Sequence, residues 1–134
     1  GTVPDAVQVG PKVCLINKYS ASDGDLFPWG FRALGLGKLI GTRTWGGIVG
    51  ISGSLPYMDG TDIRVPFFTS FDPKTGSWII ENHGVDPDIL IDNDPVKEWN
   101  GEDQQLDRAI QEVMKELQDR KPLPGVPTPR DFSK

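Results

Sequence analysis

The sequence of 134 residues has the length of one domain, or of part of one, and 37% of its residues are apolar. Its 16 glycines and 12 prolines predict a loop-rich fold rather than a helical bundle. The net charge of −5 argues against a general nucleic-acid binder, which needs a basic face. No apolar run approaches the roughly 20 residues of a membrane span, and no signal segment opens the chain, so we expect soluble material without nucleic-acid or membrane partners.

A strand–helix–strand unit is predicted near the N-terminus. Residues 12–16 are short, apolar and bounded by Pro11 and Asn17, as in a buried strand of a parallel sheet. A helix follows, with Ser20 or Ser22 as its N-cap and apolar residues at helical spacing: Leu26, Phe27, Phe31 and Leu34. Glycines 35 and 37 end this helix, and residues 38–44 form the next strand. This order is typical of a βαβ unit.

The rest of the chain is predicted to be more irregular. Residues 45–60 are glycine-rich and flexible, and residues 61–71 and 76–82 form an antiparallel pair joined by the turn "DPKTG". Residues 83–95 are extended, and residues 102–120 form an amphipathic helix with one face to bury. We assign residues 1–120 to one structured unit and residues 121–134 to a proline-rich tail that is a linker or an arm.

Several polar or aromatic residues favour structural roles. Cys14 lies in an apolar run and is expected to be a small buried hydrophobe rather than a nucleophile. We expect no metal and no cofactor, because Asp23 and Asp25 provide too few ligands for a calcium loop. The tryptophans are expected in the core and at interfaces: Trp29, Trp45, Trp78 and Trp99. One acidic group is expected to be a solvated loop: Asp86, Asp88, Asp92 and Asp94.

The stretch "SASDGD" has two interpretations. A serine between a strand and a helix N-terminus is well placed for acyl transfer, because the free N–H groups of the first turn can stabilise an oxyanion. The same position suits a serine that only caps the helix, and the aspartates suit the helix dipole. Position alone leaves both interpretations open.

Four motifs carry a family resemblance. The run "NKYSASDGD", then "GLGKLIGTRTWGGIVGI", "ENHGVDPDI" and "DQQLDRAI", resembles the C-terminal part of the catalytic domain of tricorn-type serine peptidases. The likeness covers residues 12–117 with the motifs in the same order. It implies an α/β fold, part of a crotonase-like or ClpP-like ββα spiral, in a cytoplasmic and oligomeric peptidase that acts on oligopeptides.

The resemblance also implies roles for individual residues. It places the nucleophile on Ser22 and one oxyanion donor on the N–H of Asp23. It places on Glu81 the glutamate that hydrogen-bonds the serine that orients the histidine base. Related carboxyl-terminal processing proteases use a lysine base, but Gly47 stands at that position here. Gly46 and Gly47 are candidates for substrate binding, with a turn between strands as the equal alternative.

The family's histidine base, its serine partner and the second oxyanion donor precede this stretch, so we expect the chain to be a fragment whose partner is the rest of the catalytic domain. His83, two residues after Glu81, is a less favoured base. The alternatives from other classes are a non-catalytic peptide-binding or assembly module and, with no supporting motif, acyl-CoA chemistry.

Overall fold

A computed structural model describes residues 8–53, 56–121, 125 and 128–129 of the chain. In chain order the elements are β1 (Val13–Ile16), α1 (Asp23–Ala33), β2 (Lys38–Gly41), β3 (Gly50–Gly53), β4 (Arg64–Phe68), β5 (Ile89–Leu90), α2 (Pro95–Trp99) and α3 (Gln104–Gln118). The fold is mixed α/β, as predicted. Most of the predicted tail lies outside the described residues.

A three-stranded parallel sheet organises the molecule. Its strand order is β1-β2-β5, and Val13 to Ile16 pair in register with Lys38 to Gly41. Helix α1 connects β1 to β2, so the predicted βαβ unit is confirmed. Strand β5 is short, and its Ile89 pairs with Ile40 of β2. The segment that contains β5 was predicted to be extended, but not to be a strand of the sheet.

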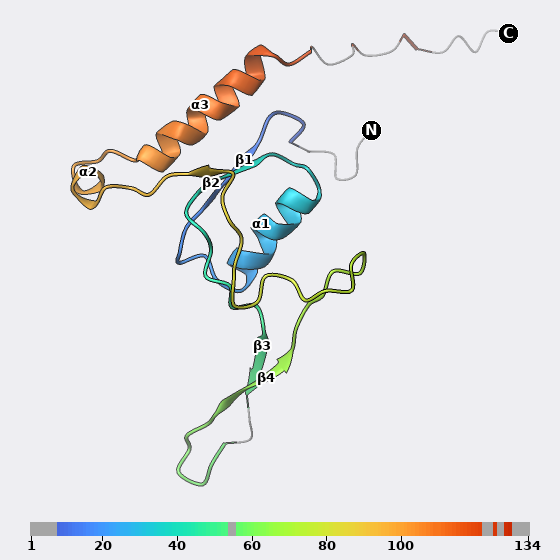
Figure 1. Ribbon diagram of the computed structural model, residues 1–134, viewed down its shortest axis with the longest axis vertical. Helices are drawn as coiled ribbons and strands as arrows, with labels where there is room; N and C mark the ends of the chain where they lie inside the picture. The colour runs from blue at the N-terminus through green and yellow to red at the C-terminus, as the bar shows by residue number, and fades with distance from the viewer. Residues whose placement is uncertain (1–7, 54–55, 122–124, 126–127, 130–134) are drawn as a thin grey trace, which may run out of the picture.

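The sheet lies between α1 and α3 (Figure 1). Alternate residues of β1 point to opposite faces: Cys14 and Ile16 pack in the cluster that contains Phe31 of α1, whereas Val13 and Leu15 line a groove with α3. Leu39 and Ile40 of β2 have no exposed surface and anchor the two faces. Burial raises the pKa of the Cys14 thiol, which is in keeping with the predicted apolar role.

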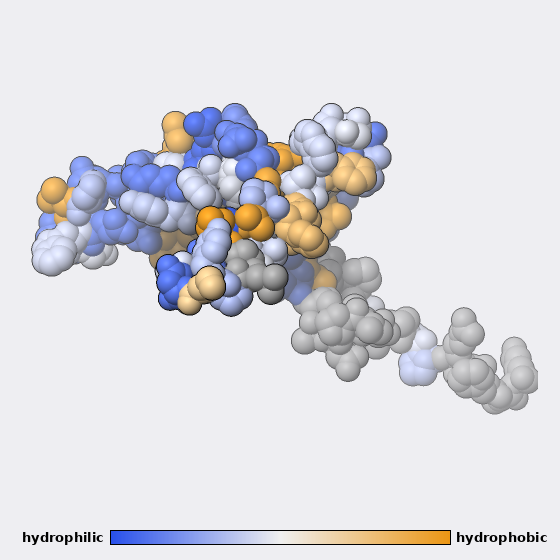
Figure 2. Space-filling model, turned by 90° about the horizontal axis from the view of Figure 1, so that it is seen from below, coloured by the Kyte–Doolittle hydropathy of each residue, from blue (hydrophilic) through white to orange (hydrophobic). Residues whose placement is uncertain are grey.

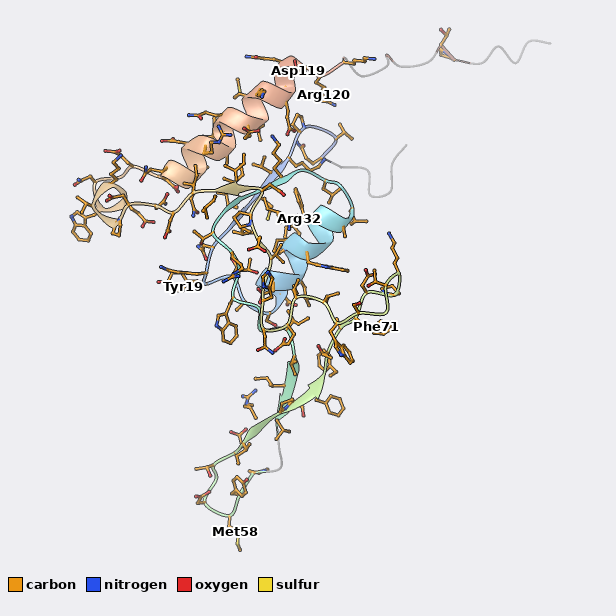
Figure 3. The ribbon with its side chains drawn as sticks, in the orientation of Figure 1. Tyr19, Arg32, Met58, Phe71, Asp119 and Arg120 are labelled. Atoms are coloured by element: carbon orange, nitrogen blue, oxygen red, sulfur yellow. The ribbon has the colours of Figure 1, made fainter. Side chains whose placement is uncertain are left out.

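The hairpin of β3 and β4 differs from the prediction. Residues 50–53 were assigned to a flexible loop, but they pair antiparallel with residues 64–68, from Gly50 opposite Phe68 to Gly53 opposite Arg64. The predicted pairing of residues 61–71 with residues 76–82 is wrong except for one bridge between Phe71 and Trp78. The hairpin projects from the body, with Met58 at its far end (Figures 1 and 3).

Apolar side chains stay exposed on this projection. Among the described residues of the hairpin they are Ile51, Tyr57, Met58, Ile63, Val65, Phe67 and Phe68, and Phe71 and Trp78 are exposed on the segment that follows. Figure 2 views the molecule from the side toward which the hairpin points, and apolar surface is visible there in orange. Of the four tryptophans, Trp29 packs against the core, whereas Trp45, Trp78 and Trp99 are exposed. The core part of that prediction therefore holds for Trp29 alone.

The C-terminal helix is confirmed over Gln104–Gln118, with Asp103 as its N-cap. Its buried residues include Glu112, whose carboxylate contacts Lys38 Nζ and an Arg108 nitrogen, each at 2.6 Å. Burial of a carboxylate is tolerated when cations satisfy both of its oxygens. The contact with Lys38 joins α3 to the start of β2, whereas the contact with Arg108 lies within α3.

The four aspartates of the predicted solvated acidic loop are exposed, and two of them also have structural partners. Asp88 accepts a hydrogen bond from Leu39 N at 2.7 Å and pairs with Arg32 of α1 at 3.0 Å. Asp94 caps α2 by accepting from Val96 N and Lys97 N. These side chains have defined structural partners because the segment closes both the sheet and a helix start. None of the helices in the described part of the chain has the length and apolar character needed to span a bilayer.

Candidate active site

Ser22 lies where the polypeptide turns from β1 into α1. It is the N-cap residue of α1, its side chain is exposed, and its backbone has φ 56° and ψ −111°. An N-cap residue ordinarily has an extended backbone, and a positive φ in a residue other than glycine costs about 1–3 kcal/mol. Such strain is found where a side chain must be presented at a sharp turn. Ser22 and Asp25 have the arrangement of a capping box, so Ser22 caps α1 in a backbone conformation that is unusual for a cap residue.

Ser20 supports the turn that precedes Ser22. Its hydroxyl accepts from Asn17 N at 3.1 Å, and its own N–H donates to Asn17 O at 2.9 Å. Its carbonyl oxygen accepts from Trp45 N at 2.9 Å. All polar groups of Ser20 thus serve the local structure, which distinguishes the two serines.

Asp23 is the first residue of α1, and its backbone N–H belongs to the donors that a helix cannot satisfy internally. The next amides are used: Gly24 N donates to Ala21 O, and Asp25 N and Leu26 N donate to Ser22 O. No described residue accepts a hydrogen bond from Asp23 N. A free donor therefore adjoins the exposed hydroxyl, as an oxyanion site requires.

Asp25 is fully buried, and backbone amides surround its carboxylate. Oδ1 accepts from Gly46 N at 2.8 Å, and Oδ2 accepts from Gly47 N at 3.1 Å and from Ser22 N at 2.9 Å. The sequence suggested only a dipole charge or a weak cation ligand here. Instead the carboxylate ties the serine turn to a loop 21 residues away. Across the described residues, no group of three or more potential metal-ligating side chains is arranged around an ion site.

Glu81 holds the other end of the same loop. Its Oε2 accepts from Ile48 N at 2.7 Å and from Val49 N at 2.9 Å. Its neighbours Ile80 and Asn82 have φ values of 29° and 60°, so the turn around Glu81 is strained as the serine turn is. No described residue donates to Oε1 of Glu81. The side chain also borders a cavity of about 310 Å³ lined by Val49 and Trp78.

The structure thus joins Ser22 and Glu81 through five consecutive amides. Trp45 N donates to Ser20, the amides of Gly46 and Gly47 donate to Asp25, and those of Ile48 and Val49 donate to Glu81. We call residues 45–49 the amide bridge. Sequence inspection could not find it, because main-chain donors leave no pattern in residue types.

Gly46 of the amide bridge has a conformation that requires glycine. Its φ is 86°, and a Cβ atom there would lie 2.4 Å from Gly84 N. Its carbonyl oxygen accepts from Asn82 N at 2.7 Å, so the residue is packed against the turn after Glu81. Gly47 is half-buried, and the closest atoms to a Cβ there belong to the exposed ring of Trp45.

His83 lies beside the amide bridge and faces solvent. Its Nε2 is 2.9 Å from an oxygen of Asp86, and both side chains are 58% exposed. No contact between His83 and Ser22 exists among the described residues. The alternative base suggested by sequence therefore has a carboxylate partner of its own and no direct path to the hydroxyl.

The chain is similar in sequence and in structure to known proteins. Residues 3–91 match the model of peptidase family S41. Tricorn protease of Thermoplasma volcanium is 46% identical over 109 residues, which are 81% of this chain and 10% of that protein. Tricorn protease homolog 1 of Streptomyces coelicolor is 42% identical over 107 residues, 80% of this chain and 10% of that protein.

A solved crystal structure of the tricorn protease is 45% identical and superposes with a TM-score of 0.72, covering 79% of this chain and 10% of that chain. The chain thus spans about a tenth of the length of these relatives. The family model covers both the serine turn and the Glu81 turn. The chain belongs to peptidase family S41.

Proposed function

We propose that the chain is the nucleophile-bearing part of a serine peptidase and that Ser22 attacks the carbonyl carbon of a peptide bond. The observation that carries this proposal is an exposed hydroxyl on a strained turn, next to the unused N–H of Asp23 at the start of α1. Family membership and the names of the relatives support hydrolysis of peptide bonds.

In the proposed reaction the Ser22 oxygen forms an ester with the acyl group as the peptide C–N bond breaks. The hydroxyl proton passes through a base to the leaving amine, and water then hydrolyses the ester. The N–H of Asp23 donates to the oxyanion at each tetrahedral intermediate. A histidine base and a second oxyanion donor come from the rest of the catalytic domain, which completes a ClpP-like spiral around the present sheet.

Glu81 is proposed to act through the group that orients this base. Two amides fix its Oε2, and Glu81 borders the cavity next to Val49. A fixed carboxylate with one remaining acceptor suits a role in holding an imidazole in a single tautomer through a hydroxyl group. His83 stays the weaker alternative, because no contact links it to Ser22 among the described residues.

The proposal for Gly46 and Gly47 is that they shape the substrate site. Both of their N–H groups are taken up by Asp25, and Gly46 is buried, so direct contact with a peptide falls to the half-buried Gly47. Oligopeptide substrates, a homo-oligomeric assembly and a cytoplasmic setting remain predictions from the family resemblance.

The test is an active-site-directed fluorophosphonate added to the full-length protein. We expect stoichiometric labelling on the tryptic peptide that contains Ser22, loss of peptide hydrolysis on labelling, and no labelling of Ser22→Ala. The control variant Ser20→Ala keeps a reactive nucleophile, because Ser20 only supports the turn. Labelling at another serine, with Ser22→Ala fully active, would refute the proposal.

A non-catalytic assembly module is the second candidate. An apolar groove of about 330 Å³ between α3 and β1 leaves Leu106, Ile110 and Met114 about half exposed. Exposed apolar grooves are typical of surfaces that pack against another part of a protein. Absence of fluorophosphonate labelling in a properly assembled protein would favour this function.

A further inference from the structure

We propose that Asp25 is a positioning residue that holds the nucleophile and the amide bridge in one rigid unit. This inference rests on the proposed function of Ser22 and extends it to a residue that does not touch the substrate. Its evidence is the juxtaposition of one buried carboxylate with three backbone donors from two separate segments.

The surroundings of Asp25 show that the carboxylate is placed for its contacts. A buried carboxylate is unfavourable unless hydrogen bonds or cations satisfy it. The side chain of Asp25 has no exposed surface, and neither a lysine nor an arginine among the described residues pairs with it. Three amide donors at 2.8–3.1 Å take that role. An apolar residue there would leave these three N–H groups without their acceptor, and the contact of the Gly46 N–H is buried.

The contact with Ser22 bears directly on nucleophile geometry. A residue with φ 56° and ψ −111° keeps that conformation only when its surroundings fix it. The N–H of Ser22 donates to Asp25, and its carbonyl oxygen accepts from Asp25 N and Leu26 N. Both peptide groups of Ser22 are therefore bound within the first turn of α1, and Asp25 takes part in each. The hydroxyl direction and the orientation of the Asp23 amide follow from these restraints.

The contacts with Gly46 and Gly47 extend the restraint to Glu81. Within the amide bridge, Gly47 N donates to the Asp25 carboxylate, and the next amide, Ile48 N, donates to the Glu81 carboxylate. A displacement of the bridge at one end therefore moves the carboxylate at the other. We infer that Asp25 sets the separation between the serine turn and the Glu81 turn.

An alternative is that Asp25 only stabilises the helix start, because a carboxylate at the third helical position commonly accepts from the N-cap amide. That role requires one of the three contacts, with Ser22 N. It leaves the contacts with Gly46 and Gly47 unexplained, since these belong to another segment. The positioning role predicts that a substitution of Asp25 slows the reaction of Ser22 in folded protein, whereas the helix-start role predicts only a loss of stability.

The test compares Asp25→Asn with Asp88→Asn in the full-length protein. Asp88 is a matched control because its carboxylate also accepts a buried amide, from Leu39, and also joins α1 to the sheet, through Arg32. We measure the fluorophosphonate labelling rate at Ser22 per folded molecule, together with kcat and KM. For Asp25→Asn we expect labelling and kcat to fall by about 100-fold with KM little changed, because small displacements of a reacting group cost this much. For Asp88→Asn we expect lower thermal stability and an unchanged labelling rate.

Each outcome decides one question. If wild-type protein is labelled at Ser22 and folded Asp25→Asn is labelled at the same rate, the positioning role is wrong and the proposed function stands. If wild-type protein is not labelled at Ser22, the proposed function itself fails. Should Asp25→Asn not fold, Asp25→Glu keeps both acceptors and moves them by one methylene group. A wild-type labelling rate in that variant would equally overturn the inference.

Discussion

Replacing Gly46 with alanine should open the amide bridge, and the structure sets the size of the effect. An L-residue at φ 86° bears a strain of about 1–2 kcal/mol. The new Cβ would also lie 2.4 Å from Gly84 N, a main-chain atom that can yield only if the turn moves. Overpacking of this kind costs about 1–3 kcal/mol. We therefore expect Gly46→Ala to lower the local opening free energy by about 2–5 kcal/mol.

Hydrogen exchange measured by mass spectrometry on the full-length protein gives this quantity for the amides of residues 46–49. A loss of 2 kcal/mol or more corresponds to exchange that is about 30-fold faster or beyond. Gly47→Ala is the matched control: the three atoms closest to its Cβ would all belong to the exposed ring of Trp45, which can rotate away, so we expect a change below about 1 kcal/mol. Equal exchange rates in the two variants would refute the reasoning.

Three further predictions concern stability. Gly30→Ala in α1 should raise the free energy of unfolding by about 0.5–1 kcal/mol in a urea titration, because no atom lies within 4 Å of the new methyl group; a decrease would contradict it. Leu39→Ala should lower it by about 2–5 kcal/mol, since Leu39 has no exposed surface, and a loss below 1 kcal/mol would show that the core is elsewhere. The hydrogen bond from Lys38 holds the pKa of Glu112 below its usual range. The stability that the ionised Glu112 contributes is therefore complete above about pH 4.3 and is lost as the pH falls through the lowered pKa. Glu112→Gln should make the free energy of unfolding depend less on pH in the acid range.

The parallel core was predictable from local signals, whereas the hairpin was not. An apolar run, helical spacing and terminal glycines all indicated the βαβ unit, and each signal lies within the element it describes. Strand β3 contains two glycines in four residues and exists because it pairs with β4, so its evidence lies outside its own sequence. The turn "DPKTG" suggested an antiparallel pair of strands on either side of it. The turn forms, but the segments that flank it are joined by a single bridge. Helix α2 could have been found from Asp94 followed by Pro95, a regular N-cap and first-turn pair.

The candidate site divides in the same way. Ser22 and Glu81 were identified from motifs, and the structure places them at two strained turns that the amide bridge connects. The role of Asp25 was not predictable, because it depends on glycine amides 21 and 22 positions away. A carboxylate two residues into a helix has an ordinary local explanation, and only burial shows that the explanation is insufficient.

The use of main-chain donors in the amide bridge determines which substitutions it tolerates. Trp45 and Val49 contribute their N–H groups, while the exposed ring of Trp45 makes no polar contact among the described residues. Many side chains could therefore replace that ring without loss of the bridge. Proline is the exception, since it alone lacks the hydrogen that the bridge donates. Relatives should thus have side chains of many sizes and polarities at position 45, but not proline.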